Sequence, residues 1–125
     1  MNDIAHLTEY HTHAPYNPAA KAAYLKLGTK YLRQLAKALE LAKGSYDVRT
    51  CKGGIAVPGE CILHGEWLYL QICNDYGGPG PGIMYRRCEG RKDYVGKTNQ
   101  WSAIYVLNDL PAFAEQIKIA LGEGG

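Results

Sequence analysis

The sequence lacks the features that would assign it at once to a large class of proteins. It has no Cys-x-x-Cys pair, no complete catalytic triad and no apolar run near the roughly 18 residues that span a bilayer. The first 20 residues contain Asp3, Glu9 and three His, where a signal peptide would have an apolar core. We therefore expect a cytoplasmic protein that enters no membrane, binds no metal and carries no cofactor.

What is present is the composition of one ordinary globular domain, with 46% hydrophobic and 21% charged residues and a net charge of +2. A chain of this length buries roughly two-thirds of the surface that it exposes when unfolded, so it can form a core without disulfides. We therefore expect the four cysteines to be reduced thiols, buried in strands as small apolar side chains. They are Cys51, Cys61, Cys73 and Cys88.

The most regular segment is an amphipathic helix near the N-terminus. Asn17 is a suitable N-cap, Pro18 is a favourable first helical residue, and Gly44 is a suitable C-terminal stop. Gly28 interrupts the apolar stripe, so we expect either one long helix or two collinear pieces. Residues 1–16 have no steady period and are expected to form a flexible N-terminal arm.

Beyond this helix the apolar period changes to two, which predicts short antiparallel strands. The segments with this pattern are 46–51, 55–57, 60–64, 67–73, 83–88 and 102–107. The Gly- and Pro-rich segment 74–82 predicts an exposed hairpin loop. A second helix is expected to begin near Pro111, with Asn108 or Asp109 as its cap, and to end at Gly122.

This order predicts a single α+β domain over residues 17–125, in which both helices cover one face of an antiparallel meander of four or five strands. The residues expected on the opposite face are Trp67, Tyr69, Gln71 and either Tyr85 with Arg87 or Met84 with Arg86. A sheet face with such a mixture of aromatic and cationic groups either stays in water or meets a partner.

Positive charge concentrates in two segments of the chain. Residues 18–52 contain eight Lys or Arg against two acidic residues, and residues 86–97 contain five against two. In the first segment the basic residues Lys26, Lys30, Arg33 and Lys37 lie on the polar side of the helix, which is usually just a solvated face. In the second, the run from Gly90 to Thr98 has five residues between its glycines where a phosphate-binding loop has four, so we do not expect nucleotide hydrolysis.

The second segment leads to the main functional prediction, which is nucleic-acid binding. Lys and Arg neutralise phosphates, and aromatic side chains stack on unpaired bases. The expected phosphate contacts are Arg86, Arg87, Arg91, Lys92 and Lys97. We expect Tyr94 and Trp101 to stack on bases and Asn99 to hydrogen-bond a base edge.

Two alternatives give the same residues different roles. In one, the aromatic sheet face forms a homodimer or binds another protein, since Tyr, Trp and Arg also dominate protein interfaces, and the basic segment is structural. In the other, His64 or Asp93 lies beside a nucleophile in the pocket of a small enzyme. The direction in which the side chains of residues 86–99 point separates these possibilities.

One further pattern extends through the central half of the chain. It comprises Leu63-His64, the run from Leu68 to Gln71, and the run from Tyr85 to Gly96, which contains Gly-Arg-Lys-Asp-Tyr and is followed by Asn99. In these residues the chain resembles a group of small bacterial proteins associated with plasmids, phages and integrating elements. Lys97 departs from the resemblance, which leads us to expect a second Gly after Gly96. The resemblance implies an accessory protein of a mobile element and favours DNA-related or regulatory roles over metabolic ones.

Overall fold

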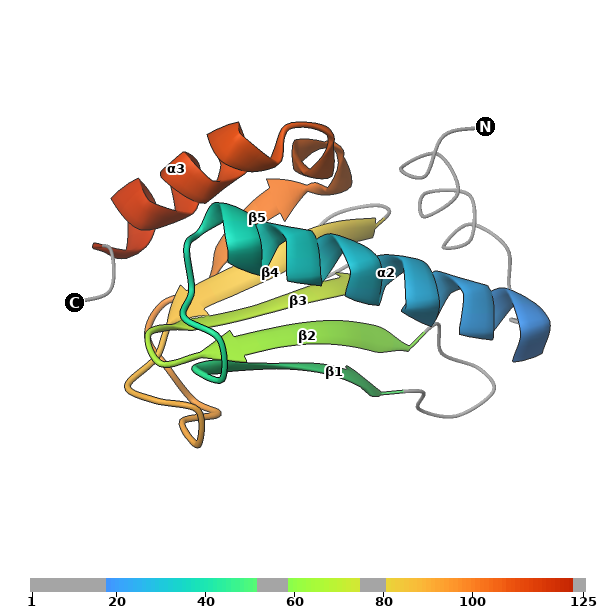
Figure 1. The fold of residues 1–125 in the computed structure, drawn as a ribbon, viewed down its shortest axis with the longest axis horizontal. Coiled ribbons are helices and arrows are strands. Elements are labelled where there is room, and N and C mark those ends of the chain that lie inside the picture. Colours follow the sequence, from blue (N-terminus) through green and yellow to red (C-terminus); the bar gives the residue numbers. More distant parts are fainter. Residues whose placement is uncertain (1–17, 52–58, 75–80, 123–125) are drawn as a thin grey trace.

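The computed structural model describes residues 18–51, 59–74 and 81–122. Its elements are, in order, α2 (Pro18–Ala38), β1 (Tyr46–Cys51), β2 (Glu60–Gly65), β3 (Leu68–Asn74), β4 (Pro81–Arg87), β5 (Gln100–Ala103), the 3₁₀ helix η1 (Ile104–Asn108) and α3 (Leu110–Leu121). The strands form one antiparallel sheet in the order β1-β2-β3-β4-β5. Figure 1 shows both α-helices over the same face of this sheet, so the predicted α+β meander is confirmed. The predicted arm over residues 1–16 and the strand over 55–57 lie outside the described residues.

The helix α2 is unbroken, and its Gly28 lets the helix backbone lie close to β2. Tyr24, Leu25, Leu32 and Leu35 of its apolar stripe are buried. Between them, Gly28 faces β2, and a Cβ at this position would clash with the Sγ atom of Cys61. Of the two alternatives for this segment, the single long helix is therefore the one that forms.

Three predicted element ends are wrong. The helix α2 does not continue to Gly44, because Glu40 adopts a left-handed φ of 58° and the next amide bonds back to the carbonyl of Ala36. The predicted strand 102–107 is a short β5 followed by η1, since Ile104 and Leu107 are both buried and three residues apart, which is the period of a 3₁₀ helix. The predicted loop 74–82 is shorter, because its first residue pairs with Pro81 in the ladder between β3 and β4.

The main core lies between the helices and the sheet. Strand alternation turns Leu63, Leu70, Ile72, Ile83 and Tyr85 toward the helices, as the hydrophobic pattern predicts. Helix α3 contributes Phe113, Ala114, Ile117 and Leu121, and its start is capped by Asp109, whose Oδ1 accepts a hydrogen bond of 3.1 Å from the amide of Ala112. The same alternation places Met84 and Arg86, not Tyr85 and Arg87, on the opposite face of the sheet.

The cysteines follow the prediction only in part. Cys61 and Cys88 are buried free thiols, and burial raises the pKa of Cys61 to about 12. Cys51 is exposed, because it lies at the end of the edge strand β1. The Cys73 side chain lies outside the described part of the structure.

Among the described residues, no helix is long and apolar enough to cross a membrane and no three His, Cys, Asp or Glu side chains gather as metal ligands.

Candidate functional site

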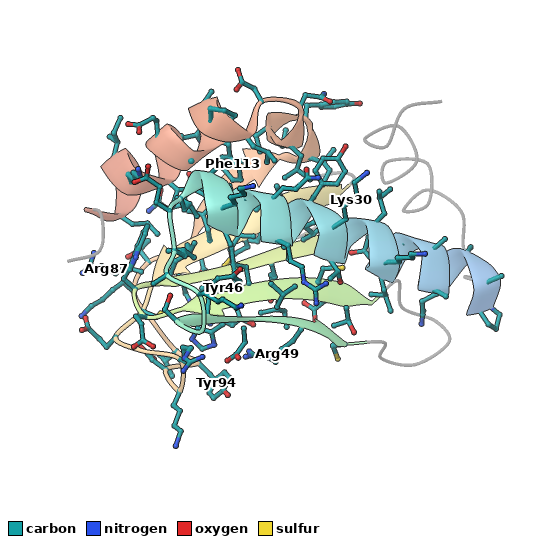
Figure 2. The ribbon with its side chains drawn as sticks, viewed as in Figure 1. Lys30, Tyr46, Arg49, Arg87, Tyr94 and Phe113 are labelled. Atoms are coloured by element: carbon teal, nitrogen blue, oxygen red, sulfur yellow. The ribbon has the colours of Figure 1, made fainter. Side chains whose placement is uncertain are left out.

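The predicted nucleic-acid contacts lie on β4, on β5 and on the segment that joins them. We name residues 88–99 the return loop, because this segment folds back from the end of β4 across the sheet face that the helices leave uncovered. Its contacts on that face include His64 on β2 and Arg49 on β1. Figure 2 shows Tyr94 of the return loop beside Arg49, on the side of the sheet away from the helices.

Asp93 holds the return loop in shape. Its Oδ1 accepts hydrogen bonds from the amides of Val95 and Gly96, at 3.1 and 3.0 Å, and its Oδ2 accepts one from the amide of Glu89 at 3.0 Å. The hydrogen bond from Gly96, followed by those from Glu89 and Val95, lowers the pKa of the Asp93 carboxyl. The protein's own carboxylate therefore occupies backbone amides that a phosphate-binding loop would turn toward its ligand.

Gly96 is required where the return loop meets β4. Its φ is 66°, and a Cβ there would lie 2.8 Å from the carbonyl oxygen of Arg87 and from Cδ of Arg86. The next amide, of Lys97, bonds to the same Arg87 carbonyl at 2.9 Å. Only glycine allows this contact without strain.

Arg86 is bound within the chain. Its Nη2 donates to the carbonyl of Tyr94 at 2.6 Å, its Nη1 donates to Oδ1 of Asn99 at 3.2 Å, and its guanidinium lies 4.4 Å from the ring centroid of Tyr69. Its Nε is buried and has no hydrogen-bond partner among the described residues. The structure therefore brings Arg86, Tyr94 and Asn99 together, but as a contact between the sheet and the return loop.

Arg87 points to the other face of the sheet, toward α3. Its Nη1 donates to the carbonyls of Leu121 and Gly122, at 2.9 and 3.3 Å. These carbonyls end α3, where the helix dipole favours a cation. Arg87 is thus separated by the sheet from the other predicted contacts.

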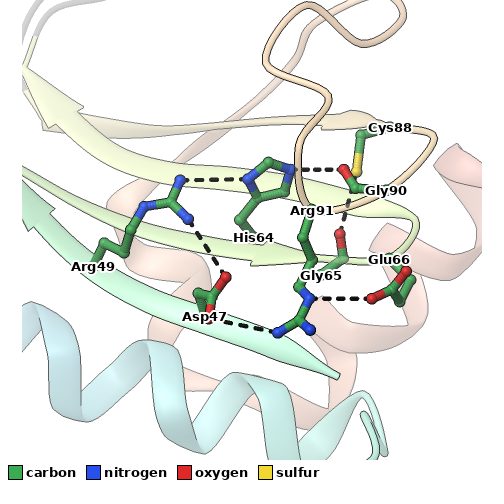
Figure 3. A network of polar contacts seen from close by, with 8 residues as sticks. All are labelled: Asp47, Arg49, His64, Gly65, Glu66, Cys88, Gly90 and Arg91. Carbon is green, nitrogen blue, oxygen red and sulfur yellow. Dashed lines mark hydrogen bonds and ion pairs between the residues drawn. The ribbon is translucent and has the colours of Figure 1, made fainter. Parts of the chain in front are cut away.

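Arg91 joins the return loop to two neighbouring elements. Its Nε lies 3.1 Å from Oε1 of Glu66, and its Nη1 lies 3.5 Å from Oδ1 of Asp47 on β1 (Figure 3). The side chains are about half exposed, so each ion pair is weak, but together they hold Arg91 against the sheet.

His64 lies at the centre of the contact between the return loop and the sheet. Its Nε2 is 3.0 Å from the carbonyl of Gly90, and its Nδ1 is 3.3 Å from Nη2 of Arg49 (Figure 3). Because a guanidinium only donates, Nδ1 must accept, and the proton of the neutral ring is on Nε2. Burial, more than any single neighbour, lowers the pKa of His64. Both ring nitrogens are occupied, so His64 is not placed as the base of an enzyme.

The aromatic residues expected to form a dimer surface are not exposed together. Tyr85 packs edge-to-face on Phe113 in the main core, with ring centroids 5.8 Å apart. Tyr69 is buried with Met84 and Cys88 on the opposite face. Trp67 is half-buried against the main core. A homodimer stays a prediction, and it would have to use another surface.

The remaining predicted contacts face solvent. Lys92 is exposed, and Lys97 is 65% exposed with its Nζ 4.0 Å from Oε1 of Glu89. Tyr94 is 60% exposed and Trp101 42%. Asn99 is also exposed, although its Oδ1 accepts from Arg86, so five of the eight predicted contacts have side chains that a ligand could reach.

The partners of the basic residues were not predicted from the sequence. Asp47 and Arg49 are two residues apart on the edge strand β1, and side chains two apart on a strand point to the same face of the sheet. Both therefore face the side that the helices leave uncovered. The spacing of Asp93 and Gly96 is typical of a turn held by an aspartate side chain. The pairing of Arg91 with Asp47 joins residues far apart in the chain and has no local signal.

A second feature is a groove of about 830 Å³ along the outer side of α2. Its apolar lining includes Ala22, Ala23 and Leu25, its basic lining is Lys26, Lys30 and Arg33, and Thr50 of β1 lies at one side. The whole of α2 contains five Lys or Arg and no acidic residue. Within the described part of the chain, no carboxylate forms an ion pair with Lys26, Arg33 or Lys37.

Comparisons with protein-family models, with curated proteins and with solved structures found no match to this chain. Two surfaces of the described structure bear on function, the return loop and the α2 groove.

Proposed function

We propose that this protein is a small interaction module that binds an acidic, amphipathic segment of another protein in the α2 groove. The observation that carries the proposal is the combination, in one groove, of an apolar lining with the exposed cations Lys26 and Arg33, which form no ion pair with a carboxylate among the described residues. An amphipathic helix in such a groove buries its apolar face and places its carboxylates at the rim.

The basic rim has the chemistry that this partner needs. Lys26 and Arg33 are exposed, and such long side chains bury their methylene stems along an apolar surface while their charged ends reach outward. A rim of one charge accelerates the approach of an oppositely charged partner and rejects partners of like charge. The apolar lining then provides the burial that makes a complex last.

Nucleic-acid binding is the second candidate function, and the exposure of Lys92, Tyr94, Lys97 and Trp101 is the observation that favours it. The resemblance to proteins of mobile elements agrees with this candidate. It ranks second because Arg86, Arg87 and Arg91 bind groups within the chain. In addition, the described residues that line the α2 groove include no aromatic side chain on which a base could stack.

Fluorescence anisotropy tests the proposal with a labelled helical peptide that has Leu on one face and Glu on the other. A peptide of the same composition, scrambled so that neither face forms, is the control ligand. Lys26→Glu/Arg33→Glu reverses two charges in the groove, and Lys92→Glu/Lys97→Glu reverses two in the return loop. We expect the wild-type protein to prefer the amphipathic peptide, with affinity reduced about tenfold or more by the groove variant alone.

Three results would contradict the proposal. They are no saturable binding to the wild-type protein, equal binding of the scrambled peptide, and the same loss of affinity in both double variants. Parallel titrations with single- and double-stranded DNA at two salt concentrations test the second candidate. Salt-dependent DNA binding that only Lys92→Glu/Lys97→Glu removes would favour nucleic acid as the partner.

A further inference from the structure

A smaller cavity lies at the end of the molecule where both α-helices finish. Its volume is about 280 Å³, and its lining comes from the chain just after α2, from the turn between β2 and β3, and from α3. Figure 1 shows these three parts at the left edge of the molecule. We name this cavity the end pocket, and none of its described lining residues lines the α2 groove. Pockets for drug-sized ligands measure about 300–1,000 Å³, so the end pocket has room for a small metabolite.

The end pocket is lined by charges of both signs that do not pair with each other. Glu40 and Glu66 supply carboxylates, and Lys118 supplies an ammonium group. Within the described chain, no ion pair joins Lys118 to either carboxylate. A ligand that carries both an ammonium and a carboxylate group can bridge this gap, with a charge-assisted hydrogen bond at each end.

The internal partners of these groups leave room for a ligand. The Nζ of Lys118 lies 3.7 Å from Oε1 of Glu115, and Oε1 of Glu66 lies 3.1 Å from Nε of Arg91. The side chains of Glu115 and Glu66 are 69% and 60% exposed, so each ion pair is weak. An ammonium group has three donors and a carboxylate has about four acceptor sites, so each group can bind a ligand and keep its internal partner.

Glu40 adopts a backbone conformation that helix ends mostly reserve for glycine. Its φ is 58°, in the left-handed region, just after the last turn of α2. A residue with a Cβ is strained there, and the exposed Glu40 carboxylate forms no ion pair within the described residues that would compensate. Backbone strain of this kind clusters at sites that hold ligands.

The apolar part of the end pocket is formed by Trp67, with Leu39 and Leu41. Trp67 is half-buried against the main core, and its carbonyl accepts a hydrogen bond of 3.0 Å from the amide of Cys88. An indole ring offers a large apolar contact at a low cost in conformational entropy. A ligand with an apolar side chain therefore matches this part of the lining.

We propose that the end pocket binds a free amino acid with an apolar side chain. The ammonium group of the ligand contacts Glu40 and Glu66, its carboxylate contacts Lys118, and its side chain packs on Trp67. This site goes beyond the proposed function and does not depend on it.

A fluorescence titration tests the site in a Trp101→Phe background, where Trp67 is the single tryptophan. The ligands are L-leucine, isopentylamine, which lacks the carboxylate, and isocaproate, which lacks the ammonium group. We expect L-leucine to change the Trp67 emission along a saturable curve. We also expect it to bind about tenfold or more tightly than either analogue, because each analogue leaves one charge of the pocket without a partner.

Substitutions assign the two charges of the ligand to their partners. In Lys118→Gln, L-leucine should bind no more tightly than isopentylamine, because the carboxylate has lost its contact. In Glu40→Gln, L-leucine and isopentylamine should both bind more weakly, and isocaproate should be unaffected. Lys92→Gln is the matched control, because Lys92 is exposed in the return loop, outside the end pocket.

Glu40→Gly separates binding from stability. This variant removes a carboxylate and relieves the left-handed strain, so the urea midpoint of unfolding should rise while L-leucine binds more weakly. A Glu40 that serves only the fold would change the midpoint and leave the affinity for L-leucine unchanged.

Three results would overturn the proposal. They are the absence of saturable L-leucine binding by both fluorescence and isothermal titration calorimetry, binding of either analogue as tight as that of L-leucine, and equal losses of affinity in Lys92→Gln and Lys118→Gln. If a variant does not fold, the comparison of the three ligands on the Trp101→Phe protein still decides the question.

Discussion

The return loop and helix α2 are the two basic regions of this chain, and they use their charge in opposite ways. In the return loop and the end of β4, Arg86, Arg87 and Arg91 bind carbonyls and carboxylates of the chain itself. On α2, Lys26 and Arg33 have no carboxylate partner among the described residues. The cause is local composition, because acidic residues surround the first region and α2 contains none. A basic stretch becomes a basic surface only where its neighbours leave it uncompensated.

The comparison predicts that substitutions in the return loop change stability, whereas substitutions on the outer side of α2 change binding alone. The largest loss is expected for Gly96→Ala, which introduces strain at a φ of 66° and an overlap with the Arg87 carbonyl. We expect the free energy of unfolding to fall by about 2–4 kcal/mol, measured by urea denaturation. Gly44→Ala is the control, because its φ is 84° but nothing lies within 4 Å of the added Cβ. Equal losses in both variants would show that the close approach at Gly96 is unimportant.

A substitution on the side of α2 that packs on the sheet should also lower the free energy of unfolding. Gly28→Ala places a methyl group against the Sγ atom of Cys61, and we expect a loss of about 1–2 kcal/mol after allowing for the better helix propensity of Ala. In a Cys61→Ala background the same substitution should cost less, because the clashing atom is gone. A double-mutant cycle from thermal unfolding measures the difference. A cost unchanged by Cys61→Ala would contradict the packing of α2 on β2.

Acid should destabilise the protein through His64. The folded His64 has a lowered pKa, so between that value and 6.5 the unfolded chain binds more protons than the folded chain. The stability conferred by the neutral ring is therefore complete above pH 6.5 and falls as the pH decreases toward the folded pKa. Urea denaturation at a series of pH values should show this decline in the wild-type protein and a flatter profile in His64→Gln. Parallel profiles for the two proteins would exclude His64 as the cause.

The smallest expected changes in unfolding free energy come from removing basic side chains in each of the two regions. Arg91→Ala removes two half-exposed ion pairs and should cost up to about 1 kcal/mol of unfolding free energy. Lys26→Ala/Arg33→Ala removes two exposed side chains and should change it by no more than about 0.5 kcal/mol. The same thermal unfolding assay compares both. A larger loss in the α2 variant would mean that its basic side chains stabilise the fold.

Most of the fold could be predicted from the sequence, because periodicity is a local signal. The period of two located β1 to β4 to within a few residues, and of the two expected caps Asn108 and Asp109 it is Asp109 that begins α3. Errors arose where tertiary packing overrode a local pattern, as at Ile104 and Leu107, whose shared burial winds the chain into a 3₁₀ turn.

The candidate site was less predictable. The basic residues were found, but their orientation depends on partners far away in the chain, such as Asp47 for Arg91 and the end of α3 for Arg87. No local pattern in the sequence pairs these groups. The α2 cations were visible as a stripe, whereas the apolar groove beside them appears only once the helix is packed on the sheet.

The most direct test of the account is a titration of ¹⁵N-labelled protein with the amphipathic acidic peptide, monitored by amide chemical shifts. The account predicts that the amides from Ala22 to Arg33 and that of Thr50 shift with a common saturation curve, while those from Arg91 to Lys97 stay in place. Shifts confined to residues 91–97, with α2 unchanged, would contradict it and would place the anion-binding surface on the return loop.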